Sequence, residues 1–311
     1  MNEITEKIQQ QINSVIIGKQ EVVAKVLMAI LARGHVLLED VPGVGKTTLA
    51  VGFARTLGLD TRRIQFTSDT MPSDILGFSV YNKQTGKFDF KPGAVMTNVL
   101  LADEINRTSS KTQSALLEAM EESQVTVDGK TYPLPQPFVV LATQNPVGSA
   151  GTQLLPSAQL DRFLIRTTMG YPDPDSQVDI LKERHHENPL DRLRSVVDRQ
   201  QLEGLIAQTE QVHIADSVYR YVVDLVTATR ESEMIDLGVS PRGALAVCRM
   251  AKACAFLHGR DYVTPGDVRE IFPDVCCHRL VLSAKARLHR QSAADLVAAA
   301  LDSVPMPQVQ E

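Results

Sequence analysis

The sequence predicts an α/β fold in which helices cover a parallel sheet and a small all-helical domain follows. Short apolar segments alternate with helical patterns through the first half of the chain, which is typical of a parallel sheet. The expected strands are residues 35–39, 62–66, 99–103, 138–143 and 163–167. A segment with two prolines, residues 171–175, ends this alternation. We therefore expect two domains, residues 1–171 and residues 172–311.

The second half of the chain contains helical patterns with clear starts. Ser240 and Pro241 form an N-cap followed by a first-turn proline, and Thr264 and Asp267 form a capping box. The expected helices are residues 176–186, 200–211, 216–232, 241–257, 265–271 and 293–303. These patterns predict a helical lid domain beside the sheet.

Two inserts in the first domain have the pattern of β-hairpins. Residues 124–132 alternate around Asp128 and Gly129, and an Asp-Gly pair is the strongest short-range hairpin signal. Residues 79–90 turn at residues 84–86. Such hairpins either cover the edge of the core or carry a function, and the sequence favours neither role.

The composition limits the classes of function. The 311 residues are 43% hydrophobic and 22% charged, with a net charge of -5, so a surface built to hold nucleic acid is not expected. No apolar run is long enough to span a bilayer, which predicts a cytosolic protein without a membrane partner. The four cysteines lack C-x-x-C spacing and are expected to be reduced packing residues rather than zinc ligands.

Residues 40–48 lie between an expected strand and an expected helix and have the composition of a phosphate-binding loop. Gly43 and Gly45 allow the backbone to turn its N–H groups toward phosphate oxygens. Lys46 is expected to reach the β and γ oxygens, and Thr47 is expected to ligate Mg²⁺. The alternative is a glycine-rich turn that binds no ligand.

Polar side chains follow the other expected strands, at the edge where parallel sheets collect their chemistry. Asp103 and Glu104 come directly after a buried strand; we expect Asp103 to hold Mg²⁺ and Glu104 to polarise the attacking water. The alternative for this pair is an acidic helix start. Asn145 follows the next strand and is a candidate for orienting water, although Asn-Pro is also an ordinary turn signal.

Two arginines are candidates for contacts with phosphate. Arg162 lies just before the last expected strand, where it either points toward a neighbouring subunit's nucleotide or forms a salt bridge with a nearby acid. Arg242 begins a helix of the second domain, and we expect it to reach back across the cleft to the phosphates. By itself each arginine is a weak signal.

Taken together, these motifs resemble the MoxR family of AAA+ ATPases, which belongs to the P-loop NTPases. The resemblance covers nearly the whole chain, and its motifs occur in the order of that family. The matching segments are residues 16–20, 40–48, 103–107, 143–146, 160–163, 238–242, 263–268 and 273–280.

The resemblance implies a role for each candidate residue. The cofactor-binding set is Ile17 and Gly18 beside the adenine, Gly43, Val44, Gly45, Lys46, Thr47 and Thr48 of Walker A, and Asp103 of Walker B. The metal ligands in this set are Thr47 and Asp103. The catalytic set is Glu104, Asn145 as sensor one, Arg162 as the arginine finger, and Arg242 as sensor two.

The resemblance also implies ligands and partners. The ligands are ATP and Mg²⁺, and the partners are further copies in a homo-hexamer, a protein with a von Willebrand factor A domain, and a client protein that is matured or activated. The two hairpins match inserts that face the central pore of such a ring. Asp40 occupies the position of the first Walker A glycine, and a carboxylate near the β-phosphate is expected to weaken ATP affinity.

The leading hypothesis is therefore an ATP-driven machine that remodels partner proteins. One alternative is a scaffold in which ATP binding alone docks a partner. Another is a nucleic-acid translocase with a basic pore formed by Lys83, Lys87, Lys91 and Lys130. Because the chain is acidic overall, we expect this basic rim to receive an acidic or flexible segment of a protein partner instead.

Overall fold

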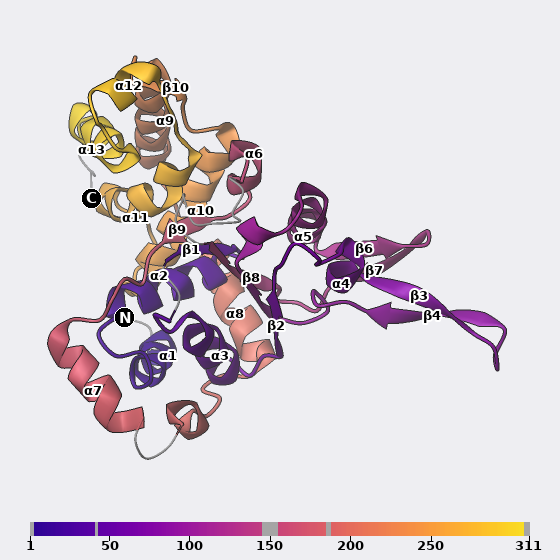
Figure 1. The fold of residues 1–311 in the computed structure, drawn as a ribbon. Coiled ribbons are helices and arrows are strands. Elements are labelled where there is room, and N and C mark those ends of the chain that lie inside the picture. Colours follow the sequence, from indigo (N-terminus) through magenta and orange to yellow (C-terminus); the bar gives the residue numbers. More distant parts are fainter. Residues whose placement is uncertain (1–2, 41–42, 145–154, 185–187, 308–311) are drawn as a thin grey trace.

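The computed structural model describes residues 3–40, 43–144, 155–184 and 188–307 of the chain. Its centre is a five-stranded parallel sheet in the order β2-β5-β8-β1-β9 (Figure 1). The strands are β1 (Val36–Glu39), β2 (Thr61–Gln65), β5 (Val99–Asp103), β8 (Val139–Gln144) and β9 (Ile165–Thr167). Each lies where the sequence predicts a strand, with small shifts at the ends, so the predicted α/β fold is confirmed.

Because the strands are parallel, their carboxyl ends meet at one edge of the sheet. The register pairs Leu38 of β1 with Thr143 of β8, and Gln65 of β2 with Asp103 of β5. The phosphate loop follows β1, and the acidic pair begins at the last residue of β5. We call this side the carboxyl edge and the opposite side the amino edge.

Two hydrophobic clusters cover the two faces of the sheet. Leu37 of β1 belongs to one cluster and Leu38 to the other, as expected for successive residues of a strand. Strand β5 is buried along its whole length, which explains the run of apolar residues from Val99 to Ala102. The helices and short turns of the sheet domain are α1 (Glu3–Asn13), α2 (Gln20–Leu31), α3 (Lys46–Thr56), α4 (Pro72–Leu76), η1 (Ile105–Arg107), α5 (Ser110–Glu122) and α6 (Ser157–Leu160).

Both predicted hairpins are present. They are formed by β3 (Gly77–Asn82) with β4 (Lys87–Pro92), and by β6 (Gln124–Val127) with β7 (Lys130–Pro133). In Figure 1 the β3–β4 hairpin extends away from the rest of the molecule. The rings of Phe90 and Tyr132 stack with centroids 4.0 Å apart, so an aromatic pair joins the two hairpins.

The remaining elements are mainly helical, as predicted. They are α7 (Pro174–Arg184), η2 (Pro189–Arg192), α8 (Arg199–Glu210), α9 (Asp216–Glu231), β10 (Ile235–Leu237), α10 (Pro241–Leu257), α11 (Pro265–Cys276), η3 (Cys277–Arg279), β11 (Val281–Leu282), α12 (Ala284–Leu288) and α13 (Ala293–Ser303). The antiparallel pair β10–β11 adds a small ribbon to the lid that we expected to be all-helical. Its strands are too short to give a readable alternation.

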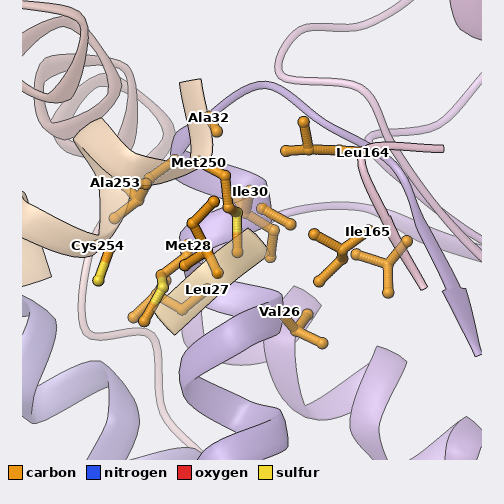
Figure 2. Packing of buried hydrophobic residues seen from close by; sticks show 14 of the residues in the cluster. Val26, Leu27, Met28, Ile30, Ala32, Leu164, Ile165, Met250, Ala253 and Cys254 are labelled. Carbon is orange, nitrogen blue, oxygen red and sulfur yellow. The ribbon is translucent and has the colours of Figure 1, made fainter. Parts of the chain in front are cut away.

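The lid packs directly against the sheet domain. Figure 2 shows Met250 and Ala253 of α10 beside Leu27 and Ile30 of α2, and one buried cluster contains residues from both helices. In Figure 1, α9 to α13 gather in one group, whereas α7 lies away from that group. The division at residue 171 therefore stays a prediction, because the buried cluster continues across it.

Candidate nucleotide site

The phosphate loop has the backbone that its glycines predict. Gly43 and Gly45 have φ angles of 89° and 97°, a region that residues with a side chain rarely adopt. Helix α3 begins directly after Gly45, at Lys46, so the N–H groups of its first turn lie at the end of the loop. A loop and a helix N-terminus in this arrangement form a site for phosphate groups.

The lysine of the loop lies close to the acidic pair. The Nζ atom of Lys46 donates a hydrogen bond of 3.0 Å to the backbone oxygen of Asp40. Burial lowers the pKa of Lys46, while the negative charges of Asp40, Asp103 and Glu104 act to raise it. The structure thus brings Lys46 together with Asp103 and Glu104, as the sequence predicts for a Walker A and Walker B pair.

The carboxylate of Asp40 is turned into the protein. It accepts hydrogen bonds from the backbone N–H groups of Met169 and Gly170, the latter at 3.1 Å and 3.2 Å to its two oxygens. Asp40 is buried, with only 6% of its surface exposed. The missing first glycine is therefore replaced by a side chain that ties the loop to the segment after β9.

The two acids at the end of β5 are held by polar neighbours. Asp103 accepts hydrogen bonds from Arg63 Nε at 2.8 Å and from Thr143 Oγ1 at 3.1 Å. Glu104 accepts one from Gln65 Nε2 at 2.8 Å and forms an ion pair with Arg107 at 3.2 Å. Arg63 and Gln65 lie on β2, so the edge strand of the sheet contacts both acids.

A cavity of about 300 Å³ opens beside the phosphate loop. The lining residues include Ile16, Ile17, Gly45, Thr48 and Tyr171. Its walls are mostly apolar, and its size is at the lower end of the range for small-molecule sites. This geometry fits the expected place of the adenine.

The segment that borders this cavity is fixed by contacts across the chain. Gly18 has a φ angle of 71°, and a Cβ there would lie 2.4 Å from Ser176 Oγ. Lys19 Nζ donates to the backbone oxygen of Tyr171 at 2.8 Å. Residues 16–19 and 171–176 therefore close on each other to form one wall of the cavity. Sequence reasoning missed the contribution of Tyr171 and α7, because nothing in their local pattern indicates a ligand.

Arg162 and Arg242 lie together at the amino edge. Glu121 at the end of α5 forms ion pairs with both, 2.9 Å from Arg162 Nε and 2.8 Å from Arg242 Nη1. The two arginines line a cavity that also includes His35, which directly precedes β1. The phosphate loop directly follows β1, so the structure does not bring Arg242 to the phosphates of its own chain, contrary to our expectation. The reason is that α10 packs on α2, and that its first turns line the same cavity as His35 at the amino edge.

A buried arginine that sequence reasoning missed fixes the segment around Arg162. Arg279 pairs with Asp161 at 2.7 Å and donates to the backbone oxygen of Phe163 at 2.7 Å. Asp161 also accepts a hydrogen bond of 3.0 Å from Ser240, at the start of α10. These contacts tie the segment before β9 to the lid. The sequence indicates Arg279 only as a member of the segment 273–280, which we assigned to the lid.

Two expectations remain without a structural test. Asn145, the candidate for sensor one, lies outside the described residues. Thr47 is half-buried in the first turn of α3, and its role as a metal ligand stays a prediction. Asp103 and Thr47 offer oxygen ligands, which is the donor type that Mg²⁺ prefers.

A second group of potential ligand atoms lies in the lid. Cys254 Sγ, His258 Nδ1 and an oxygen of Asp267 lie within 4.8 Å of one another. Arg260 binds the carboxylate of this group, because its two terminal nitrogens lie 2.6 Å and 2.5 Å from the oxygens of Asp267. The capping contacts of Thr264 use the same carboxylate. The group is therefore a salt bridge that fixes the start of α11. All four cysteines are free thiols in the structure.

Comparisons with known proteins agree with this fold and site. A model of the ATPase family associated with various cellular activities matches residues 35–165, and a model of the AAA lid domain matches residues 227–300. The chain is 42% identical over 309 residues to chaperone MoxR1 of Mycobacterium tuberculosis, which covers 96% of this chain and 81% of that protein. It is 47% identical over 298 residues to the uncharacterized protein YeaC of Bacillus subtilis, which covers 96% and 93%.

A solved structure of a candidate ATPase from Cytophaga hutchinsonii superposes with a TM-score of 0.91, at 37% identity, covering 98% of this chain and 95% of that one. The fold and the phosphate loop define a nucleotide-binding protein of the AAA+ class. The chain belongs to the MoxR family of AAA+ ATPases. Within the described ranges, no helix combines the length and apolar character needed to cross a bilayer.

Proposed function

We propose that this chain binds ATP with Mg²⁺ and hydrolyses it at the contact between two copies in a cytoplasmic ring. The observation that carries this proposal is the placement of the two charge groups. Lys46, Asp103 and Glu104 lie at the carboxyl edge, whereas Arg162 and Arg242 share Glu121 at the amino edge. A head-to-tail contact between copies joins the two edges and closes into a ring when the rotation permits.

Each group at the carboxyl edge has a defined role in this proposal. Lys46 and the N–H groups of the loop bind the phosphates, and Thr47 with Asp103 holds Mg²⁺. The metal supplies positive charge that neutralises the phosphate oxygens. Glu104 polarises the attacking water.

The arginines of the neighbouring copy complete the site. A guanidinium beside the transferred phosphoryl group is worth roughly 10³- to 10⁵-fold in rate. Because Arg162 lies away from the phosphate loop of its own chain, an isolated chain lacks this contribution. The rate per chain therefore rises with protein concentration.

The test is a mixture of two inactive variants. Lys46→Ala removes ATP binding but keeps the arginines, and Arg162→Ala keeps ATP binding but removes the finger. Each variant alone is expected to be nearly inactive. In a random equal mixture about a quarter of the contacts combine an intact site with an intact arginine, so activity returns. A mixture as inactive as its components contradicts a site shared between copies.

A matched control arginine is available in the same cavity. Arg33 lines it, but pairs with Glu203 and Glu210 of α8 at 2.9 Å and 2.8 Å. Arg33→Ala is expected to keep most of the activity. If Arg33→Ala loses as much activity as Arg162→Ala, then activity depends on the positive charge of the cavity in general and not on Arg162 as an arginine finger.

We propose further that hydrolysis moves the two hairpins against a partner protein. The β3–β4 hairpin exposes Phe88 by 67% and Tyr81 by 53%, and it carries Lys83, Lys87 and Lys91. Aromatic rings and lysines suit an extended, acidic segment of a client protein. The resemblance to the MoxR family supports a homo-hexamer and a partner with a von Willebrand factor A domain.

Glu104→Gln is the variant that captures such partners. It is expected to bind ATP without hydrolysing it, and so to retain a partner that is released on hydrolysis. A motor loses its cellular function with this substitution, whereas a scaffold that only binds ATP keeps it. Tight binding of single-stranded DNA with a steep salt dependence would instead favour a translocase.

A further inference from the structure

The lid carries an apolar groove between α9 and α10. It encloses about 670 Å³ and is lined on one side by Tyr219, Val223 and Val226 and on the other by Leu245 and Cys248. Leu245 is 67% exposed and Val223 is 50% exposed. An exposed apolar groove of this kind marks a contact surface, because leaving it in water is unfavourable.

The groove adjoins the arginines that we assign to a neighbouring copy. Arg242 lies one turn before Leu245 on α10. Arg249 lines both the groove and the cavity that contains Arg162 and Arg242. A second copy whose bound nucleotide contacts Arg162 and Arg242 therefore also lies next to the groove.

The nucleotide site presents an apolar surface of its own. Tyr171 is 75% exposed and lines the cavity beside the phosphate loop. On α7, Leu181 lines the same cavity, and Val178 lies one turn earlier on that helix; both side chains are exposed. The mouth of the nucleotide cavity is therefore an apolar surface with nothing from the described part of its own chain covering these side chains.

The charges around the two surfaces are complementary. The rim of the groove carries Arg230, Arg249 and Lys252 together with Glu210, which leaves a net positive charge. Residues 174–182 of α7 carry Asp175 and Asp179 and one opposite charge, Lys182, which lies 3.7 Å from Asp179. Opposite charges at the rim of a contact favour the correct orientation of two copies.

We propose that the groove between α9 and α10 binds α7 of a second copy of this chain. This inference rests on the proposed function, since it is the shared nucleotide site that brings the two surfaces together. The contact places Leu181 of one copy in the groove beside Cys248 of the other. It also orders α7 over the nucleotide cavity, so assembly stabilises bound ATP.

A cross-linking experiment tests this contact directly. Cys248 is half-buried in the groove, whereas Cys254 and Cys276 are fully buried. The double variant Leu181→Cys with Cys277→Ser is treated with a short bismaleimide in the presence of ATP. Covalent dimers and higher ladders are expected. They are expected to disappear when Cys248→Ser is added, and to be absent when the new cysteine replaces Leu288 of α12 instead.

A second variant tests the groove without a cross-linker. Because Leu245 is largely exposed, Leu245→Asp is expected to fold normally and to bind ATP as a single chain. It should raise the protein concentration for half-maximal ATPase activity at least about tenfold, since a charge is placed in an apolar contact. Leu288→Asp, at a side chain that is 82% exposed, is the matched control and should leave this concentration unchanged.

The outcomes separate this inference from the proposed function. If activity rises with concentration and returns in the Lys46→Ala and Arg162→Ala mixture, but neither groove variant shows an effect, then the groove contact is wrong and the shared site stands. If activity is independent of concentration, the shared site fails and the groove contact fails with it.

Discussion

The side-chain amide of Gln65 donates a hydrogen bond of 2.8 Å to the carboxylate of Glu104. Gln65 is the last residue of β2, and Glu104 directly follows β5, the neighbouring strand. Such a bond to a charged acceptor is worth about 1.5–3 kcal/mol. Strand β2 therefore holds the acid that we assign to polarising water.

Gln65→Ala is expected to raise the ATPase rate at low protein concentration. The released carboxylate turns more easily toward the attacking water, and a change of about 1 kcal/mol corresponds to about a fivefold rate increase. The measurement is steady-state ATP turnover at saturating ATP. The control is Gln65→Ala combined with Glu104→Gln, which should be inactive. A lower rate in the single variant would mean that Gln65 assists the reaction instead of restraining Glu104.

The contact between Asp40 and Gly170 leads to a second prediction. The carboxylate faces two backbone N–H groups and not the phosphates, so removing its charge should not improve ATP binding. Asp40→Asn leaves one buried N–H group without an acceptor, which costs about 1–3 kcal/mol. We expect a lower melting temperature and weaker ATP binding, measured by thermal unfolding and by titration with a fluorescent nucleotide.

A different outcome for Asp40→Asn would contradict this prediction. Tighter ATP binding with unchanged stability would show that the carboxylate repels the β-phosphate, as the sequence alone suggests. Asp60→Asn, at an exposed acid in the loop before β2, is the control for a simple loss of negative charge.

His35 gives the stability of the fold a dependence on pH. Its Nδ1 atom accepts a hydrogen bond of 3.0 Å from Val140 N–H, and its ring contacts Phe138 edge to face. Burial lowers the pKa of His35 to about 4. The unfolded chain, with a pKa near 6.5, binds a proton that the folded chain does not, so stability falls as the pH drops from about 6.5 to about 4.

His35→Phe tests this prediction because it keeps an aromatic ring at the site. At pH 7.5 the variant should be less stable by about 1–3 kcal/mol, since Val140 N–H loses its acceptor. At pH 5 the difference should shrink by about 2 kcal/mol, because the histidine of the wild-type chain is then protonated on unfolding. Urea unfolding at both pH values measures the two differences. Equal differences would show that protonation of His35 does not contribute. Burial also lowers the pKa of His278. This histidine is present in both the wild-type chain and the His35→Phe variant, so its effect on stability cancels in the difference.

The sheet and the hairpins could be predicted because their signals are local. Strand β5 is apolar from Val99 to Ala102 since both its faces are buried. The turn at Asp128 and Gly129 has the positive φ angles of 50° and 76° that an Asp-Gly pair allows. The β10–β11 ribbon could not be predicted, because its short strands pair across more than forty residues and are stabilised by contacts with neighbouring helices.

The phosphate loop and the acid pair were predictable for the same reason, since each motif lies within a few consecutive residues. The positions of Arg162 and Arg242 were not. They depend on how α10 packs against α2, and on Glu121, which is distant from both arginines in the sequence. The contacts of Gln65 and Arg63 with the acids likewise follow from the order of the strands, which no local pattern states.

The stack of Phe90 on Tyr132 gives a prediction about motion. Phe90 lies on β4 and Tyr132 on β7, and their rings are nearly parallel, with an angle of 11° between them. The base of the β3–β4 hairpin also contacts α4 and β6, and the rest of the hairpin extends away from the body of the molecule in Figure 1. An aromatic pair contributes about 0.5–1.5 kcal/mol beyond its buried area. The stack therefore restrains the longer hairpin through the shorter one.

Tyr132→Ala is expected to loosen both hairpins without unfolding the sheet. Hydrogen exchange should accelerate about three- to tenfold at residues 77–92 and 124–133, since opening becomes easier by about 1 kcal/mol. Exchange in β5 and β8 should stay unchanged. Tyr81→Ala, in the outer part of the β3–β4 hairpin, removes a different aromatic contact and should affect only that hairpin. If Tyr132→Ala changes exchange only at residues 124–133, the two hairpins move independently and the stack does not couple them.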